Sequence, residues 1–207
     1  MQKKKIDEAL KHLEKDAHLK HVVRKGPRPP VRRPGAPFAS LVRSIIFQQL
    51  SGKAAGTILK RFLELFPKTD FPTPEQVLKL KDLQFRKAGV SGQKMSYLRD
   101  LAKRFLDGTI EPKKFSKMTD EEIREHLIVV KGIGRWTADM FLMFTLYRPD
   151  VLPTGDLGIQ KGFQKVFSLK KMPSPVQMEK LAKSWEPHRT VASWYLWRVV
   201  DGEDADW

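Results

Sequence analysis

A glycine turn is the first feature of this sequence that could do chemistry. Gly132 and Gly134 lie one residue apart in VVKGIGRWTADMF, residues 129–141, between two apolar segments. Glycine permits positive φ angles and lets another molecule approach the main chain. The first amides of the following helix lack intrahelical partners and can bind an anion such as phosphate. The turn is therefore either a structural connection between two helices or a site that binds nucleic-acid backbone without reading the base sequence.

A carboxylate follows about 20 residues later. Asp156, in TGDLGI, lies where a helix should begin. Aspartate is a favoured N-cap, and most residues in such positions do nothing else. Alternatively, this carboxylate on a loop after a phosphate-binding turn could face bound DNA.

Aromatic residues are frequent in the last third of the chain. They are Trp136, Trp185, Trp194, Tyr195 and Trp197. Most should belong to the core, because helical spacing cannot place all of them on one surface. One or two lining a cleft would suit a pocket in which a base stacks.

Several standard sites are excluded. The chain has no cysteine, which removes disulfides, cysteine nucleophiles and iron–sulfur clusters. The Gly-Lys of LSGKAAGT lacks the P-loop spacing, the five histidines are scattered, and there is no nucleophile elbow.

Net charge is the strongest global signal. The 39 Lys and Arg residues against 24 Asp and Glu give +15 in 207 residues. This excess predicts attraction to a polyanion, with nucleic acid favoured over an anionic membrane surface. There is neither a membrane-spanning apolar run nor a secretory signal, so we expect a soluble, intracellular protein.

Helical spacing recurs along the chain, and no useful strand alternation is present. We expect about ten helices. A first amphipathic helix has Ile6, Leu10, Leu13 and Ala17 on one face. The arm VVRKGPRPPVRRPGAPF, with five prolines and five basic residues, should not be regular. Predicted helix starts, from capping signals, are Ser51, Thr73, Asp82, Ser91, Thr119, Asp156, Ser174 and Pro187.

Three segments together resemble one known family. LIVVKGIGRWTADMFLMFTLYRPDVLPTGDLGIQKGF, residues 127–163, is similar to the signature of the helix-hairpin-helix DNA glycosylase superfamily. SIIFQQLSGKAA and WEPHRTVASWYLWR support the resemblance, which covers about residues 38–200. Within the superfamily, the chain most resembles the 3-methyladenine DNA glycosylase II group of alkylation-repair enzymes.

The resemblance implies an all-α, two-lobed fold with a cleft between the lobes. The chain would be a single glycosylase domain, 1–207. An N-terminal helix and basic arm would occupy 1–37, a first helical lobe about 38–115, and a second lobe with the hairpin and the catalytic aspartate about 116–207.

The resemblance also assigns roles at the hairpin. The amides of Gly132, Gly134 and Thr137 would bind DNA backbone, and Arg135 would also contact DNA. Lys131 stands where proline is common in the family, and it would add positive charge beside the phosphate. Asp156 matches the invariant acid of the family. The backbone carbonyl groups that could hold a structural Na⁺ or K⁺ are those of Ile128, Val130 and Ile133; no other cofactor is implied.

The subtype follows from one position. Lyase-type members carry a lysine nucleophile directly after the hairpin arginine, and Trp136 stands there in this chain. The resemblance therefore implies a monofunctional glycosylase. The absence of cysteine argues against iron–sulfur-bearing members, and the short N-terminal region implies a compact form.

A mechanism follows for alkylated purines. The nucleotide must leave the stack, and we expect Gln49 to fill the gap, unless it only caps or packs locally. Asp156 would stabilise the oxocarbenium-like sugar and orient water. Trp136 and Trp197 would attract the cationic base, and the pocket would be bordered by Met140 and Arg198.

The sequence therefore predicts a monomeric, monofunctional glycosylase that excises alkylated purines of the 3-methyladenine and 7-methylguanine type from duplex DNA in base excision repair. It would act in bacterial cytoplasm or a eukaryotic nucleus. The alternatives are a non-catalytic helix-hairpin-helix DNA-binding protein and a same-fold glycosylase for another damaged base. A membrane or RNA binder has only charge in its favour.

Overall fold

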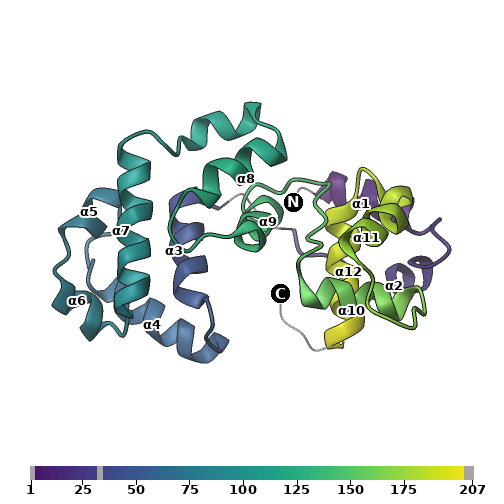
Figure 1. Ribbon diagram of the computed structural model, residues 1–207, viewed down its shortest axis with the longest axis horizontal. Helices are drawn as coiled ribbons and strands as arrows, with labels where there is room; N and C mark the ends of the chain where they lie inside the picture. Colours follow the sequence, from purple (N-terminus) through teal and green to yellow (C-terminus); the bar gives the residue numbers. More distant parts are fainter. Residues whose placement is uncertain (1–2, 32–34, 203–207) are drawn as a thin grey trace. The chain divides into compact units, whose positions relative to one another are not determined.

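The computed structural model describes residues 3–31 and 35–202, and all regular structure in these ranges is helical (Figure 1). The all-α expectation is therefore confirmed. The helices of the first half are α1 (Lys3–Leu13), α2 (Lys20–Lys25), α3 (Pro37–Phe47), α4 (Gly52–Glu64), α5 (Pro74–Lys79), α6 (Asp82–Lys87) and α7 (Gly92–Leu106). Those of the second half are η1 (Pro112–Lys117), α8 (Asp120–Ile128), α9 (Arg135–Phe144), α10 (Leu157–Val166), α11 (Pro175–Leu181), η2 (Ala182–Trp185) and α12 (Arg189–Asp201).

The chain forms two compact units. One contains residues 35–141, and the other combines residues 1–34 with 142–207. This division differs from the expected lobes 38–115 and 116–207. The hairpin turn lies with the first helical block, and the N-terminal helices pack on the last helix, α12. Spacing along the chain could not show this, because it depends on which apolar faces meet.

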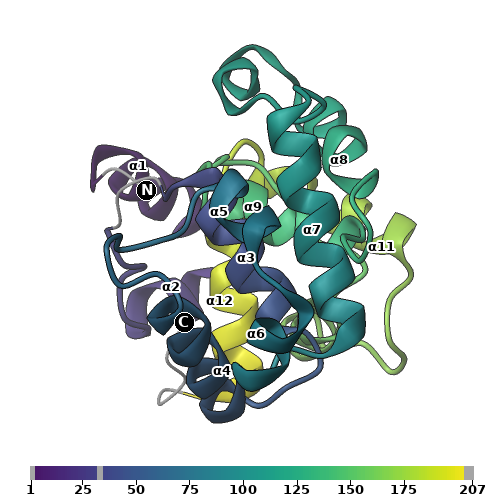
Figure 2. The same ribbon diagram turned by 90° about the vertical axis from the view of Figure 1, so that its left-hand side faces the viewer.

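The unit of residues 35–141 is organised by α7, its longest helix. Helices α3, α5 and α6 all pack against α7, and α4 packs on α3 (Figure 2). Its core contains Phe62 and Phe85, both fully buried, with ring centroids 6.1 Å apart. A rigid frame of packed helices thus supports the turns at its surface.

The other unit is built around α12. Every residue from Thr190 to Trp197 is buried, and α1, α2 and α10 pack around this helix (Figure 1). Helix α10 comes close because Gly162 faces Leu196: a Cβ at position 162 would lie 2.7 Å from the Leu196 Cβ. The first helix contributes Ile6, Leu10 and Leu13 to the core, as its spacing predicts.

Most predicted helix starts are confirmed by side-chain caps. Capping boxes form at Thr73, Thr119 and Ser174, and Ser51, Ser91 and Asp156 accept a backbone N–H of the first helical turn. A hydrogen-bonding side chain before an apolar periodic segment was therefore a reliable signal here.

Other local predictions were wrong. Asp82 is the first helical residue and Lys81 holds the cap position, while the last helix begins at Arg189 rather than at Pro187. The first helix ends at Leu13, short of Ala17, and α2 and η1 were not predicted. Residues 22–25 of the basic arm, expected to be irregular, are part of α2. Both missed helices have only six residues, too few for apolar spacing to show. Residues 32–34 of the basic arm lie outside the described residues.

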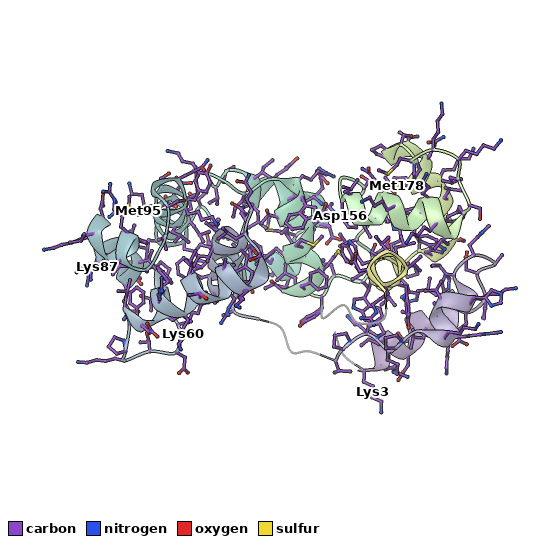
Figure 3. All side chains as sticks on the ribbon, turned by 90° about the horizontal axis from the view of Figure 1, so that it is seen from below. Lys3, Lys60, Lys87, Met95, Asp156 and Met178 are labelled. Atoms are coloured by element: carbon purple, nitrogen blue, oxygen red, sulfur yellow. The ribbon has the colours of Figure 1, made fainter. Side chains whose placement is uncertain are left out.

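None of the described helices is both long enough and apolar enough to cross a membrane. Many lysines point outward, including the exposed Lys3, Lys60 and Lys87 (Figure 3).

Candidate functional site

The turn between α8 and α9 has a geometry that requires glycine at position 132. Gly132 has a φ of 81°, in the left-handed region. A Cβ there would lie 2.1 Å from the ring of Tyr97, on α7. The Gly132 carbonyl accepts a hydrogen bond from Gln48 Nε2 at 2.7 Å. Ile133, almost fully buried, anchors the turn in the core.

Gly134 has a different environment. Its φ lies outside the left-handed region, and a Cβ at this position would meet nothing within 4 Å. The Ala138 amide donates to the Gly134 carbonyl at 3.0 Å, which begins the hydrogen-bond pattern of α9. The amides of Gly134 and Thr137 therefore have no acceptor within α9 itself. An open approach to amides at a helix N-terminus is the arrangement that suits a phosphate.

A network of charges joins the two helices of the hairpin. Arg124 donates to Asp139 at 2.7 Å and to Glu121 at 3.0 Å. Arg135 donates both terminal nitrogens to Glu121, at 2.7 and 3.0 Å, and this contact lowers the pKa of the Glu121 carboxyl. Burial raises the pKa of Asp139, against the effect of Arg124. Arg135, expected to contact DNA, is thus held by an acid in this structure.

The remaining hairpin residues are arranged as follows. The Lys131 side chain is exposed, while its amide donates to Asp100 Oδ2 at 2.9 Å. The Val130 carbonyl accepts the Ile133 amide at 3.0 Å, and its second lone pair is not used by that bond. The cation site on the carbonyl groups of Ile128, Val130 and Ile133 stays a prediction. Over residues 3–31 and 35–202, no cluster of three or more His, Asp or Glu side chains could hold a metal.

A cavity of about 790 Å³ lies beside this turn, within the unit of residues 35–141. It brings together five of the predicted site residues: Gln49, Gly132, Trp136, Thr137 and Met140. Trp136 is 50% exposed, which is unusual for tryptophan and leaves much of its indole open to a ligand. The other lining residues are Arg43, Ser44, Phe47, Gln48, Gln93, Lys94 and Tyr97.

Gln49 occupies the short connection between α3 and α4. It is exposed and has a φ of 56°, uncommon for a residue other than glycine. Phe47 and Leu50 beside it are each 40% exposed. The connection therefore exposes Gln49 and Leu50 next to the exposed Phe47 at the end of α3.

Asp156 lies in the other unit, at the start of α10 (Figure 3). Its Oδ1 accepts two hydrogen bonds, from the Ile159 amide and from Trp197 Nε1, each at 2.8 Å. The carboxylate is half-buried. It is therefore a helix cap, as the simpler interpretation proposed, but it also has a second donor that a cap alone does not need.

Trp197 differs from expectation in what it contacts. It is buried, its ring packs against Phe144 with centroids 5.9 Å apart, and its indole N–H is directed at Asp156. The sequence predicts that its ring attracts the cationic base. In this structure it holds the carboxylate in place, and the tight approach of Gly158 fixes the indole in turn.

The loop that leads to Asp156 is held by the first turns of α12. Thr190 Oγ1 donates to the Arg148 carbonyl at 2.6 Å and accepts the Val151 amide at 3.0 Å. Arg189 forms a two-point ion pair with Asp150, with both N–O distances 2.8 Å. Because these bonds fix the backbone before the aspartate, α12 determines where the carboxylate lies.

Arg198 is directed elsewhere. Its guanidinium lies 5.4 Å from the centroid of the Trp194 ring, and it lines a smaller cavity with His21 and Tyr195. Adjacent residues of a helix point about 100° apart, so Arg198 and Trp197 occupy different faces of α12. Its expected place at the border of the base pocket stays a prediction.

Sequence reasoning missed the polar residues around the cavity, chiefly Gln48, Lys94 and Tyr97. Lys94 and Tyr97 are three residues apart on the predicted helix after Ser91, and so share a face. That spacing was visible in the sequence. Nothing in one sequence says that the face is turned toward the glycine turn.

Comparison with known proteins decides the family. Residues 42–187 match the family described as HhH-GPD superfamily base excision DNA repair protein. The chain belongs to this superfamily. The match includes the α3–α4 connection, the hairpin and the aspartate loop, the segments on which the resemblance was based.

Individual members of the superfamily are similar over most of their length. DNA-3-methyladenine glycosylase 1 of Schizosaccharomyces pombe is 38% identical over 167 residues, 79% of this chain and 72% of that protein. The structure of S. pombe 3-methyladenine DNA glycosylase (Mag1) in complex with abasic DNA is 35% identical. It has a TM-score of 0.82 and covers 97% of this chain and 100% of that one. A DNA-3-methyladenine glycosidase from Bacillus halodurans gives a TM-score of 0.84 at 33% identity, covering 93% and 89%. The helix-hairpin-helix glycosylase fold is thereby confirmed.

Proposed function

We propose that this protein is a monofunctional DNA-3-methyladenine glycosylase of base excision repair, which releases alkylated purines from duplex DNA. The observation that carries the proposal is the presence, in one superfamily member, of both an open glycine turn and a fixed, half-buried Asp156. The similar proteins named above are 3-methyladenine glycosylases, and one of them is bound to abasic DNA.

DNA binding is attributed to the hairpin and to overall charge. The net charge of +15 attracts the phosphate backbone at long range. The amides of Gly134 and Thr137 contact a phosphate at the N-terminus of α9, with Gly132 shaping the turn and Lys131 adding charge. A Na⁺ or K⁺ ion on the carbonyl groups of Ile128, Val130 and Ile133 remains part of the proposal, with no step assigned to it.

Base excision requires the nucleotide to leave the helical stack. Gln49, exposed on its short connection, fills the gap in the duplex. The open indole of Trp136 stacks on the extruded base, with Met140 beside it. A base alkylated at N3 or N7 is cationic, and an aromatic face attracts a cation by about 0.5–2 kcal/mol.

The chemical step is assigned to Asp156. An alkylated purine carries positive charge, so its glycosidic bond is weak and needs little help from a general acid. As the bond breaks, positive charge develops on the sugar, and a fixed carboxylate stabilises it. The two donors on Oδ1 hold the group in place before the reaction, so little reorganisation is needed.

The absence of lyase chemistry follows from Trp136. Lyase-type members attack the sugar with a lysine amine and form a Schiff base, but an indole cannot do so. Water is therefore the nucleophile, and the product is an abasic site with an intact backbone. Sodium borohydride, which traps Schiff bases, should give no covalent protein–DNA complex.

The direct test is base release. Purified protein is incubated with methylated duplex DNA and with the same DNA before methylation, and the freed bases are identified by chromatography. The proposal expects 3-methyladenine or 7-methylguanine from the first substrate and no base from the second. Binding to DNA without release of any alkylated base would instead support a non-catalytic DNA-binding protein.

A further inference from the structure

The residue that supports the α3–α4 connection is Lys94, on α7. Its Nζ donates to the Ile46 carbonyl at 2.7 Å and to the Gln48 carbonyl at 2.8 Å. Both carbonyl groups lie at the C-terminal end of α3, where helix carbonyls lack partners and a positive charge is favoured. Lys94 thus closes the end of α3 directly beside Gln49.

The environment of Lys94 is unusual for a lysine. The side chain is half-buried, lines the cavity and has a pKa lowered by burial. Both hydrogen bonds go to backbone, so the ammonium fixes main-chain geometry rather than pairing with an acid. Gln49 has a φ of 56°, a conformation that persists only where the surroundings impose it.

The same helix face also contacts the hairpin turn. Tyr97 packs its ring against Gly132, and Asp100 accepts the Lys131 amide at 2.9 Å. Residues 94, 97 and 100 are spaced by three and share one face of α7. Gln48 closes the arrangement by donating to the Gly132 carbonyl at 2.7 Å.

We propose that Lys94 is a positioning residue for base excision, which fixes the connection carrying Gln49 against the hairpin turn. One face of α7 then holds both DNA-contacting turns as a single rigid element. The side chain that fills the gap and the amides that bind phosphate are kept at a constant separation. This inference rests on the proposed function, and it concerns how the nucleotide is extruded rather than how the bond is broken.

The geometry predicts that the effect of removing the Lys94 side chain depends on Gln49. Lys94 acts only through the connection that it holds, so its removal should matter only while Gln49 is present. A lysine that merely stabilised the fold would lower activity whether or not Gln49 was present. A lysine that contacted a DNA phosphate would change the salt dependence of binding.

The test is a double-mutant cycle. Lys94→Met keeps the length and apolar stem of the side chain and removes both hydrogen bonds, and Lys94→Arg retains donors. Each is made alone and together with Gln49→Ala. Single-turnover release of 7-methylguanine from duplex DNA is measured, with the fluorescence of a 2-aminopurine beside the lesion as a reporter of unstacking.

We expect Lys94→Met to slow base release and unstacking by about tenfold or more, because two charge-assisted hydrogen bonds are lost. In the Gln49→Ala background the same change should have little further effect, and Lys94→Arg should restore most of the rate. The salt dependence of DNA binding should not change. If Lys94→Met does not fold, Lys94→Gln, which keeps one donor group, is taken through the same cycle.

Multiplicative effects of Lys94→Met and Gln49→Ala on the rate of base release would overturn the inference. So would a change of about one, for Lys94→Met, in the slope of log binding constant against log salt concentration. Both outcomes leave the proposed function intact, provided that the wild-type protein releases alkylated bases. If the wild type releases none, the proposed function fails, and the 2-aminopurine signal still reports whether Lys94 and Gln49 act together.

Discussion

Substitutions of the two glycines in the hairpin turn test separately how the turn contributes to stability and to DNA binding. Gly132 needs a positive φ and has Tyr97 against it, whereas Gly134 has neither constraint. We expect Gly132→Ala to destabilise the protein. We expect Gly134→Ala to fold normally and to lose affinity for DNA, because its added Cβ would project into the space where a phosphate approaches.

The size of the first effect can be worked out from the structure. An alanine in the left-handed region costs about 1–2 kcal/mol, and forcing an extra methyl group into a packed site costs about 1–3 kcal/mol. At position 132 the added Cβ would lie 2.1 Å from the Tyr97 ring. Both costs apply there, so the free energy of unfolding should fall by about 2–5 kcal/mol. For a domain of this size, each 1 kcal/mol corresponds to about 2–4 °C in Tm.

The Gly134→Ala substitution should weaken DNA binding without destabilising the protein. At Gly134 an alanine restricts the unfolded chain without strain in the fold, so stability should stay the same or rise by up to about 1 kcal/mol. A hydrogen bond to a charged group contributes about 1.5–3 kcal/mol. Loss of one phosphate contact should therefore weaken DNA binding by at least about tenfold.

Thermal unfolding and fluorescence anisotropy measure the two quantities, the latter with a duplex containing a stable abasic analogue at fixed salt. Gly56→Ala serves as the control, because a Cβ there also meets nothing within 4 Å and Gly56 lies on α4, outside the hairpin. It should leave the affinity unchanged. Wild-type affinity in Gly134→Ala would refute the phosphate contact, and an unchanged Tm in Gly132→Ala would refute the geometry of the turn.

Further predictions concern the other unit. Trp197→Phe keeps the ring beside Phe144 but deletes the donor to Asp156, so single-turnover base release should fall about tenfold with DNA affinity unchanged. Gly158→Ala would place a Cβ 2.7 Å from Trp197 Cδ1 and 3.0 Å from Asp156 Oδ1; base release and Tm, measured together, should both fall. Burial raises the pKa of Tyr195 to about 12. The fold favours the protonated phenol, so the free energy of unfolding should fall by roughly 2–3 kcal/mol as pH rises from about 10 to about 12. Urea unfolding of Tyr195→Phe should lack that part of the pH dependence.

Local signals predicted the helices well, because caps depend on residues only three positions apart. Thr73, Thr119 and Ser174 illustrate this, since each forms the capping box that its sequence indicates. Residue type and spacing also predicted the glycine turn and the position of Asp156 at a helix start, whereas their roles were implied by the family resemblance. The grouping of the helices into two units was not predicted, because it depends on the packing of α1 and α2 on α12, which follows them by more than 150 residues.

The directions of side chains at the site could not be predicted from the sequence. Trp136 and Trp197 were both expected to attract the cationic base, yet Trp136 is half-exposed, whereas Trp197 is buried and donates its N–H to Asp156. The difference arises from the close packing of α10 on α12 at Gly158, which no spacing in one sequence reveals. Lys94 was missed for a related reason: its partners are backbone carbonyl groups, which leave no pattern of residue types.

The central claim is that the negative charge of Asp156 drives base release. Asp156→Asn tests it most directly, because an asparagine Oδ1 can still accept from Ile159 and Trp197, and asparagine is an equally good N-cap. Only the charge is removed. Base release from methylated duplex DNA should fall by at least about a hundredfold, with Tm and DNA affinity close to wild type. Undiminished release of alkylated bases by this variant would contradict the account.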